Sequence, residues 1–178
     1  YAHLYGLPCT GLRFFTVYGP WGRPDMAYFS FTRKILAEEK IPVFNQGKML
    51  RDFTYIDDII EIILKIVRFG SPSGKESDSV DSGVITGHTP YRVFNVGNNR
   101  SVELLRFIQV LENCIGKKAK LELLPMQDGD LPATLASTTA LEEAIGFKPK
   151  ITVETGLQRF VDWYRKYYNS NKHRSLDR

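Results

Sequence analysis

The sequence predicts an α/β protein with at least some parallel sheet, because apolar strand-like runs alternate with helical periodicity. The runs Cys9 to Thr16 and Tyr91 to Gly97 are rich in aromatic and β-branched residues, as buried strands are. Between them, residues 57–69 repeat Ile and Leu at helical spacing and leave only a narrow polar stripe. With 178 residues, the chain is long enough for one good core and a smaller lobe.

The remaining elements follow from their periodicity and from the glycines that end them. Gly6, Gly70, Gly116 and Gly146 each stand directly after a helical pattern, where a left-handed residue is favoured. We expect helices over residues 1–5, 26–39, 57–69, 101–115, 137–145 and 152–168, and strands over 9–16, 51–55, 91–97 and 121–124. Residues 41–44 are expected to form a short strand or a turn. The Ser-, Gly- and Asp-rich segment 70–89 predicts a flexible loop, and residues 169–178 predict a frayed polar tail.

Composition excludes several classes of protein. The net charge of +4 comes without a basic stripe or an aromatic RNA-binding motif, so we expect no nucleic-acid partner. No apolar run reaches the roughly 20 residues that span a bilayer, so we expect no membrane partner. The two cysteines and three histidines lack metal-ligand spacing, which predicts no metal site. Cys9 and Cys114 are interpreted as small apolar residues of a reducing compartment, and the protein as cytoplasmic.

Polar residues follow the first strand at its carboxyl end, the edge where open α/β sheets bind ligands. The run Leu12 to Met26 ends in a rigid Pro- and Gly-rich turn, and Thr16, Tyr18 and Arg23 are placed to face a polar, anionic small molecule. Tyr18 could donate to that ligand, or it could belong to the core. Arg51 follows a second glycine turn. It has two interpretations: an ion pair with Asp52 or Asp57, or a bidentate phosphate clamp.

Other groups at element ends favour a nucleoside diphosphate ligand, although each has an ordinary structural alternative. Phe44 beside Asn45 could stack on a base whose edge the amide reads, or Phe44 could belong to the core. Asp130 could accept hydrogen bonds from ribose hydroxyls or close an Asx-turn. Asp57 and Asp58 could form a general acid/base pair, but their place at a helix start favours capping.

Four segments together resemble the C-terminal half of NAD-dependent sugar-nucleotide epimerases, in the extended short-chain dehydrogenase/reductase group. They are residues 12–26, 47–59, 91–97 and 124–130. The combination of Arg-Phe-Phe-Thr-Val-Tyr-Gly-Pro-Trp-Gly-Arg-Pro-Asp-Met with Leu-Pro-Met-Gln-Asp-Gly-Asp is most similar to the UDP-glucuronate 4-epimerase branch. The resemblance runs in order from the first residue to about Tyr168.

The resemblance implies a role for each candidate site residue. Phe15 and Val17 would lie against the nicotinamide end of NAD. Thr16 stands where galactose epimerases carry Asn, and its hydroxyl would suit a sugar carboxylate. By the same resemblance, Arg23 and Arg51 would hold the diphosphate. Met26, Phe44 and Asn45 would line the uracil pocket, and Asp130 would accept from the ribose.

The implied reaction interconverts UDP-glucuronate and UDP-galacturonate through a 4-keto sugar, with NAD as hydride carrier. The resemblance places the catalytic Tyr and Lys and the glycine-rich NAD turn upstream, so this chain alone is expected to be inactive and the full-length enzyme to be a homodimer. Alternatives are another UDP-sugar enzyme of the group, a decarboxylase or 4,6-dehydratase, and a non-catalytic UDP-binding module.

The resemblance also implies how residues 1–178 are organised, as a single C-terminal fragment. The strands near 9–16 and 91–97 would be the last strands of a Rossmann-type sheet. Segments 18–55 and 117–168 would build the smaller substrate-binding lobe, interleaved with those strands along the chain.

Overall fold

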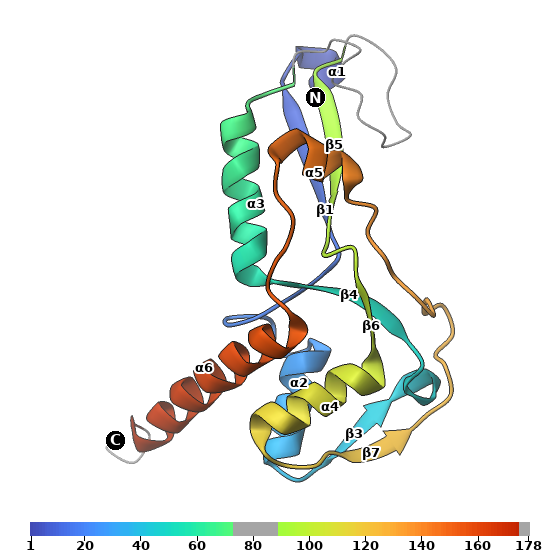
Figure 1. Ribbon diagram of the computed structural model, residues 1–178, viewed down its shortest axis with the longest axis vertical. Coiled ribbons are helices and arrows are strands. Elements are labelled where there is room, and N and C mark those ends of the chain that lie inside the picture. The colour runs from blue at the N-terminus through green and yellow to red at the C-terminus, as the bar shows by residue number, and fades with distance from the viewer. Residues whose placement is uncertain (73–88, 175–178) are drawn as a thin grey trace.

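The structure is a computed structural model that describes residues 1–72 and 89–174. It is an α/β fold, as the alternation of strands and helices predicts (Figure 1). Its elements are α1 (Ala2–Tyr5), β1 (Cys9–Phe14), β2 (Thr16–Tyr18), α2 (Ala27–Leu36), β3 (Lys40–Val43), the 3₁₀ turn η1 (Phe44–Gly47), β4 (Leu50–Tyr55), α3 (Ile56–Phe69), β5 (Tyr91–Val96), β6 (Ser101–Glu103), α4 (Leu104–Ile115), β7 (Lys120–Leu123), α5 (Thr139–Ile145) and α6 (Val153–Arg174).

One end of the molecule is built on β1 and β5, the two strands that the sequence predicts most clearly. They pair in parallel, in register from Cys9 with Tyr91 to Phe14 with Val96. Helices α3 and α5 pack beside them (Figure 1). Ile62 and Val96 are fully buried in the small apolar cluster that results. This end therefore has a core of its own.

The expected strand 9–16 is wrong in one respect, because the chain changes sheets at Phe15. Strand β1 ends at Phe14, and β2 then pairs in parallel with β4. The N–H of Phe15 still donates to the carbonyl of Val96 at 3.0 Å, so the last contact with β5 comes just before the new pairing begins. Phe15 and the first two residues of β2 thus form a crossing segment, residues 15–17, that carries the chain from one sheet to the other. Apolar composition alone does not distinguish it from one continuous strand.

The other end is a lobe with an aromatic core. Strand β4 pairs with β2 on one side and antiparallel with β6 on the other, while β3 and β7 form a separate parallel pair. Helices α2, α4 and α6 enclose a cluster in which Tyr18, Tyr28, Phe107 and Phe160 are almost completely buried. The hydroxyl of Thr152 accepts from the N–H of Thr155 at 3.3 Å, which confirms the expected start of α6.

Several element boundaries differ from expectation. The helix expected over 26–39 ends at Leu36, and the helix expected over 137–145 begins at Thr139. Ser101 was expected to begin a helix, but residues 101–103 form β6, and α4 begins at Leu104, whose N–H donates to the carbonyl of Met49 at 2.9 Å. Helix α6 continues to Arg174, into the segment for which a frayed tail is expected. Residues 175–178, and residues 73–88 of the expected flexible loop, lie outside the described residues.

An apolar stripe and an open strand edge lie next to each other at the β1–β5 end. Ile60, Leu64 and Val67 follow one another on α3 and are 48%, 52% and 73% exposed. Within the described chain, β1 pairs with β5 only, so its other edge keeps unpaired backbone N–H and C=O groups. Such a combination favours association between chains.

We expect the isolated chain to self-associate at tens of micromolar concentration, and light scattering after size exclusion would measure its mass. The variant Leu64→Lys should shift the distribution toward monomer because it places a charge inside the stripe. Leu135→Lys is the matched control, since Leu135 is similarly exposed, at 57%, but lies outside α3. A sharp monomer peak for the unmodified chain at high concentration would contradict the prediction.

No helix among the described residues is long and apolar enough to cross a membrane.

Candidate functional site

Two hollows lie on the two sides of the crossing segment 15–17. Thr16, Phe44 and Arg51 help to line a hollow of about 340 Å³. Phe15 and Val17 help to line the other, of about 490 Å³, together with Arg23 and Met26. Successive side chains of an extended segment point to opposite sides, so Thr16 faces one hollow while its two neighbours face the other. We call them the Thr16 hollow and the Phe15 hollow.

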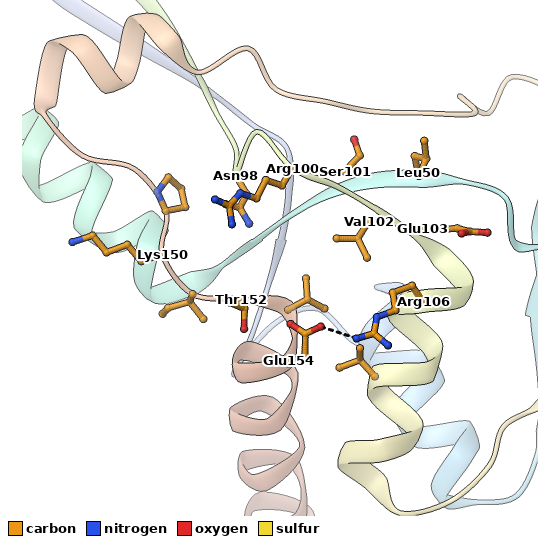
Figure 2. A pocket seen from close by; sticks show the side chains of 14 residues that line it. Leu50, Asn98, Arg100, Ser101, Val102, Glu103, Arg106, Lys150, Thr152 and Glu154 are labelled. Atoms are coloured by element: carbon orange, nitrogen blue, oxygen red, sulfur yellow. Dashed lines mark hydrogen bonds and ion pairs between the residues drawn. The ribbon is translucent and has the colours of Figure 1, made fainter.

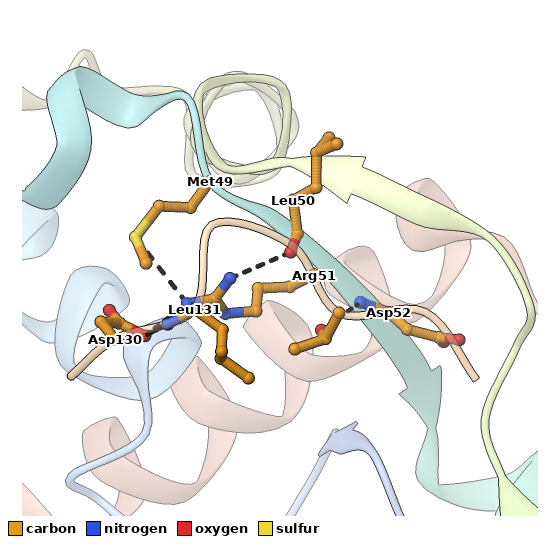
Figure 3. Close-up of polar contacts among 7 residues, drawn as sticks. Met49, Leu50, Arg51, Asp52, Asp130 and Leu131 are labelled. Atoms are coloured by element: carbon orange, nitrogen blue, oxygen red, sulfur yellow. Dashed lines mark hydrogen bonds and ion pairs between the residues drawn. The ribbon is translucent and has the colours of Figure 1, made fainter. Parts of the chain in front are cut away.

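An ion pair joins Arg51, which lines the Thr16 hollow, to a second expected ligand-binding residue, Asp130, which does not line it (Figure 3). A guanidinium nitrogen of Arg51 lies 2.8 Å from Oδ1 of Asp130, although the residues are 79 positions apart. Both side chains are mostly buried, with exposed fractions of 19% and 33%. The expected alternative partners of Arg51, Asp52 and Asp57, are wrong.

The ion pair is anchored to the backbone on both sides. Arg51 also donates to the carbonyl of Leu50 at 3.0 Å, and Asp130 accepts from the N–H of Leu131 at 2.8 Å. Asp130 was considered as the residue that closes an Asx-turn, which would use the N–H two residues further on, but its local hydrogen bond comes from the next residue, Leu131. A planar guanidinium held at one edge by a carboxylate keeps further N–H donors for an anionic oxygen.

Arg23 lies apart from Arg51, in the wall of the Phe15 hollow. Its side chain is 75% exposed, and one guanidinium nitrogen lies 3.3 Å from Asp25 and 3.5 Å from the sulfur of Met26. Asp25 lines the Thr16 hollow, so the Arg23–Asp25 pair stands between the two hollows. An ion pair this exposed contributes little stability, which leaves Arg23 free to exchange partners.

Asn45 belongs to η1 and lines neither hollow. Its φ of 49° and that of Gln46, 52°, lie in the left-handed region, which Asn tolerates better than most residues. Its carbonyl accepts from the N–H of Lys48 at 2.9 Å and closes the expected turn. Phe44, directly before it, packs against the lobe core and also lines the Thr16 hollow. Its position is thus compatible both with core packing and with stacking on a base.

Asp57 and Asp58 form neither the acid/base pair nor the helix cap that were considered. Helix α3 has no side-chain cap at its start. Asp58 is buried and accepts from the N–H groups of Lys150 and Ile151 at 3.1 and 2.9 Å, whereas Asp57 forms an ion pair with Arg159. Asp58 thus ties α3 to the segment before α6, a tertiary contact that local spacing does not reveal.

A third hollow, of about 540 Å³, lies between β6, the start of α4 and the start of α6 (Figure 2). It contains none of the expected site residues, and no sequence motif indicated it. Arg106 reaches Glu154 across it at 3.1 Å. The pKa of the Glu154 carboxyl lies below its ordinary value, mainly because the carboxylate accepts from the backbone N–H of Glu154 and also because it accepts from Arg106. These polar groups satisfy one another.

The resembled family carries its catalytic Tyr and Lys in a Tyr-xxx-Lys motif, and the same spacing occurs at Tyr168 and Lys172, in the last turns of α6. The ring of Tyr168 packs against Tyr164 and Phe29, with ring-centroid distances of 4.5 and 6.0 Å. Tyr168 lines none of the three hollows, so this match in spacing is not part of the candidate site. Within residues 1–72 and 89–174, no group of three or more His, Cys, Asp or Glu side chains could hold a metal ion.

Comparison with known proteins shows what the whole chain is similar to. Residues 1–83 match the NAD dependent epimerase/dehydratase family. The chain is 49% identical to Protein CapI of Staphylococcus aureus over 168 residues, and 46% identical to a probable UDP-glucuronate 4-epimerase of Rhizobium meliloti over 169 residues. In both cases the alignment covers 94% of this chain and 50% of the relative. The chain thus spans about half the length of the curated relatives it matches.

A solved structure extends the likeness to the fold. The UDP-glucuronic acid 4-epimerase of Bacillus cereus, in complex with UDP-glucuronic acid and NAD, superposes with a TM-score of 0.76 at 27% identity. The superposition covers 93% of this chain and 48% of that one. The likeness therefore concerns one half of the longer protein.

Proposed function

Because residues 1–83 match the NAD dependent epimerase/dehydratase family, we propose that the chain belongs to this family and is the UDP-sugar-binding half of a UDP-glucuronate 4-epimerase. The full-length enzyme would interconvert UDP-glucuronate and UDP-galacturonate, as a cytoplasmic homodimer. The observation that carries the proposal is the Arg51–Asp130 pair beside Thr16 at one hollow. Likeness to a bacterial epimerase solved with UDP-glucuronic acid and NAD supports the choice of ligand.

The Thr16 hollow offers the groups that an acidic nucleotide sugar needs. Arg51 supplies charged donors to a diphosphate. Asp130 does not line the hollow itself, but its carboxylate pairs with Arg51 at the wall and would offer acceptor oxygens to ribose hydroxyls. Phe44 provides an apolar ring for the base. Thr16 offers a small hydroxyl donor to a sugar carboxylate, and Arg23 adds a second cation at the boundary between the hollows.

The residues of the Phe15 hollow fit one end of NAD. Phe15, Val17 and Ile56 give it an apolar wall, which suits the flat nicotinamide ring. When bound, NAD supplies reversible hydride transfer at C4 of the sugar. The residues of this chain would bind and orient the two ligands on opposite sides of residues 15–17, while the Tyr and Lys that move protons would belong to the other half of the enzyme.

We expect calorimetry to detect binding of UDP and UDP-glucuronate to this chain, and Arg51→Ala to weaken it by about 1.5–3 kcal/mol, as for other charge-assisted contacts. Arg51→Lys should recover only part of the loss because it keeps the charge but not the planar fork. Arg68→Ala is the control and should bind normally, because Arg68 is an exposed residue of α3. Absence of heat at millimolar UDP would count against the proposal, and unchanged affinity of Arg51→Ala would remove Arg51 from the clamp.

A second substitution tests which sugar the hollow prefers. We expect Thr16→Asn to weaken binding of UDP-glucuronate more than binding of UDP-glucose, because the larger amide takes the place of a small hydroxyl donor. Displacement titrations with both sugars on the same variant would measure the ratio of the two affinities. Equal losses for the two sugars would mean that Thr16 does not contact the carboxylate.

Product analysis of the full-length enzyme tests the reaction itself. UDP-galacturonate is expected, whereas a xylose or a 4-keto-6-deoxy sugar would identify a decarboxylase or a dehydratase.

A further inference from the structure

Trp21 combines an unfavourable backbone conformation with an exposed side chain. Its φ of 62° lies in the left-handed region, where a bulky L-residue costs about 1–2 kcal/mol. The side chain is 73% exposed, so burial in a core does not offset this cost. Such an outlier persists only where surrounding contacts hold it, and it often marks a functional turn.

The contacts that hold Trp21 come from α6. Its indole packs edge-on against Trp163 and Tyr167, with ring-centroid distances of 5.2 and 5.0 Å. Trp163 and Tyr167 are themselves stacked on each other at 5.4 Å, one helical turn apart. Aromatic pairs of this geometry contribute about 0.5–1.5 kcal/mol each beyond the area they bury. Together they are large enough to balance the strain at Trp21.

The turn around Trp21 is held from a second side by Tyr28 of α2. The Tyr28 hydroxyl donates to the carbonyl of Gly19 at 3.4 Å. A Cβ atom at Gly22 would overlap that hydroxyl, so the backbone passes directly over it. Residues 19–22 are therefore fixed between α2 and α6, and the next residue is Arg23.

We propose that Trp21 is a positioning residue, whose indole anchors the 19–22 turn on α6 and so sets where the Arg23 guanidinium lies at the boundary between the two hollows. This inference rests on the proposed function, since Arg23 is assigned there to the diphosphate. The Arg23 side chain is exposed, and its pair with Asp25 is a weak surface contact. The anchored turn therefore decides where the Arg23 backbone lies, and the guanidinium can reach only what is near that point.

Two substitutions of Trp21 separate the anchor from the strain. Trp21→Gly removes the indole and also the cost of the left-handed conformation, whereas Trp21→Ala removes only the indole. If Trp21 positions Arg23, both variants should bind UDP-glucuronate about fivefold more weakly in calorimetry, a size typical of coupled neighbours. Trp21→Gly should nevertheless be the more stable of the two in urea unfolding, and Trp21→Phe should recover most of the affinity.

A double-mutant cycle shows whether Trp21 acts through Arg23. In an Arg23→Ala background, Trp21→Gly should cause no further loss of affinity, because the group that it positions is gone. A full additional loss would overturn the proposal, as would normal affinity of Trp21→Gly alone. Glu38→Gly is the matched control: Glu38 also has a left-handed φ, 59°, but lines none of the three hollows, so its affinity should not change. If the unmodified chain fails to bind, the proposed function fails instead.

Discussion

Replacing Asp52 by alanine will lower the free energy of unfolding of this chain by at least about 3 kcal/mol, since each buried donor left unsatisfied costs about 1–3 kcal/mol. Asp52 is completely buried in β4. Its carboxylate accepts from three backbone N–H groups, those of Asn98, Asn99 and Ala136, at 2.8, 3.0 and 3.0 Å. The side chain thus joins β4 to the loop after β5 and to the segment before α5.

Urea unfolding followed by circular dichroism would measure the effect. Asp52→Asn should fall between wild type and Asp52→Ala, because the amide keeps one acceptor oxygen but points an N–H₂ group at donors. Asp128→Ala is the matched control, since Asp128 is exposed, and surface substitutions usually change stability by less than about 0.5 kcal/mol. If Asp52→Ala is as stable as that control, water satisfies the three donors and the carboxylate is not needed.

Phe160→Ala should produce a loss of similar size, about 3–5 kcal/mol, for a different reason. Phe160 has no exposed surface and lies at the centre of the lobe core. Its ring packs edge-on against Tyr28 at 4.8 Å and contacts Phe29 at 5.9 Å, which joins α6 to α2. Truncation removes these contacts and leaves a cavity that rigid aromatic neighbours cannot fill.

The comparison for Phe160 is the same substitution at an exposed phenylalanine. Phe14→Ala, at a residue that is 46% exposed, should cost much less in the same urea experiment. Comparable losses for the two variants would show that the lobe core relaxes into the space left by Phe160. The tryptophan fluorescence of Phe160→Ala gives a second measurement, because Trp163 lies 5.8 Å from that ring.

The sequence was sufficient to predict most of the elements, but it missed the short strand β6 and the place where the chain changes sheets. The helix ending at Gly116 and the strand over 91–97 were predicted from periodicity and glycine alone, and both were found. The break at Phe15 was missed because apolar residues continue through it, and only the pairing of β2 with β4 reveals it. The start of α4 was misplaced because a tertiary hydrogen bond from Leu104 decides it.

The resemblance to sugar-nucleotide epimerases, found from four motifs, was confirmed by the comparisons. Contacts between distant residues lay beyond local reasoning. Two acidic residues close in sequence, Asp52 and Asp57, were considered as ion-pair partners of Arg51, yet its partner is Asp130, 79 positions away. Asp58 stands at a helix start as expected, yet instead of capping that helix its carboxylate accepts from the backbone N–H groups of Lys150 and Ile151. Charged side chains near one another in sequence often turn to different faces, and only the fold decides which charges meet.

The crossing segment 15–17 has a consequence for how this protein can diverge. Because its side chains alternate between the two hollows, Thr16 can be exchanged without touching the surface that Phe15 and Val17 present on the other side. A single-residue insertion or deletion in this segment would instead turn each following side chain to the opposite side and so change the lining of both hollows at once. Natural variants should therefore differ in residue identity at position 16 while the length of this crossing stays invariant.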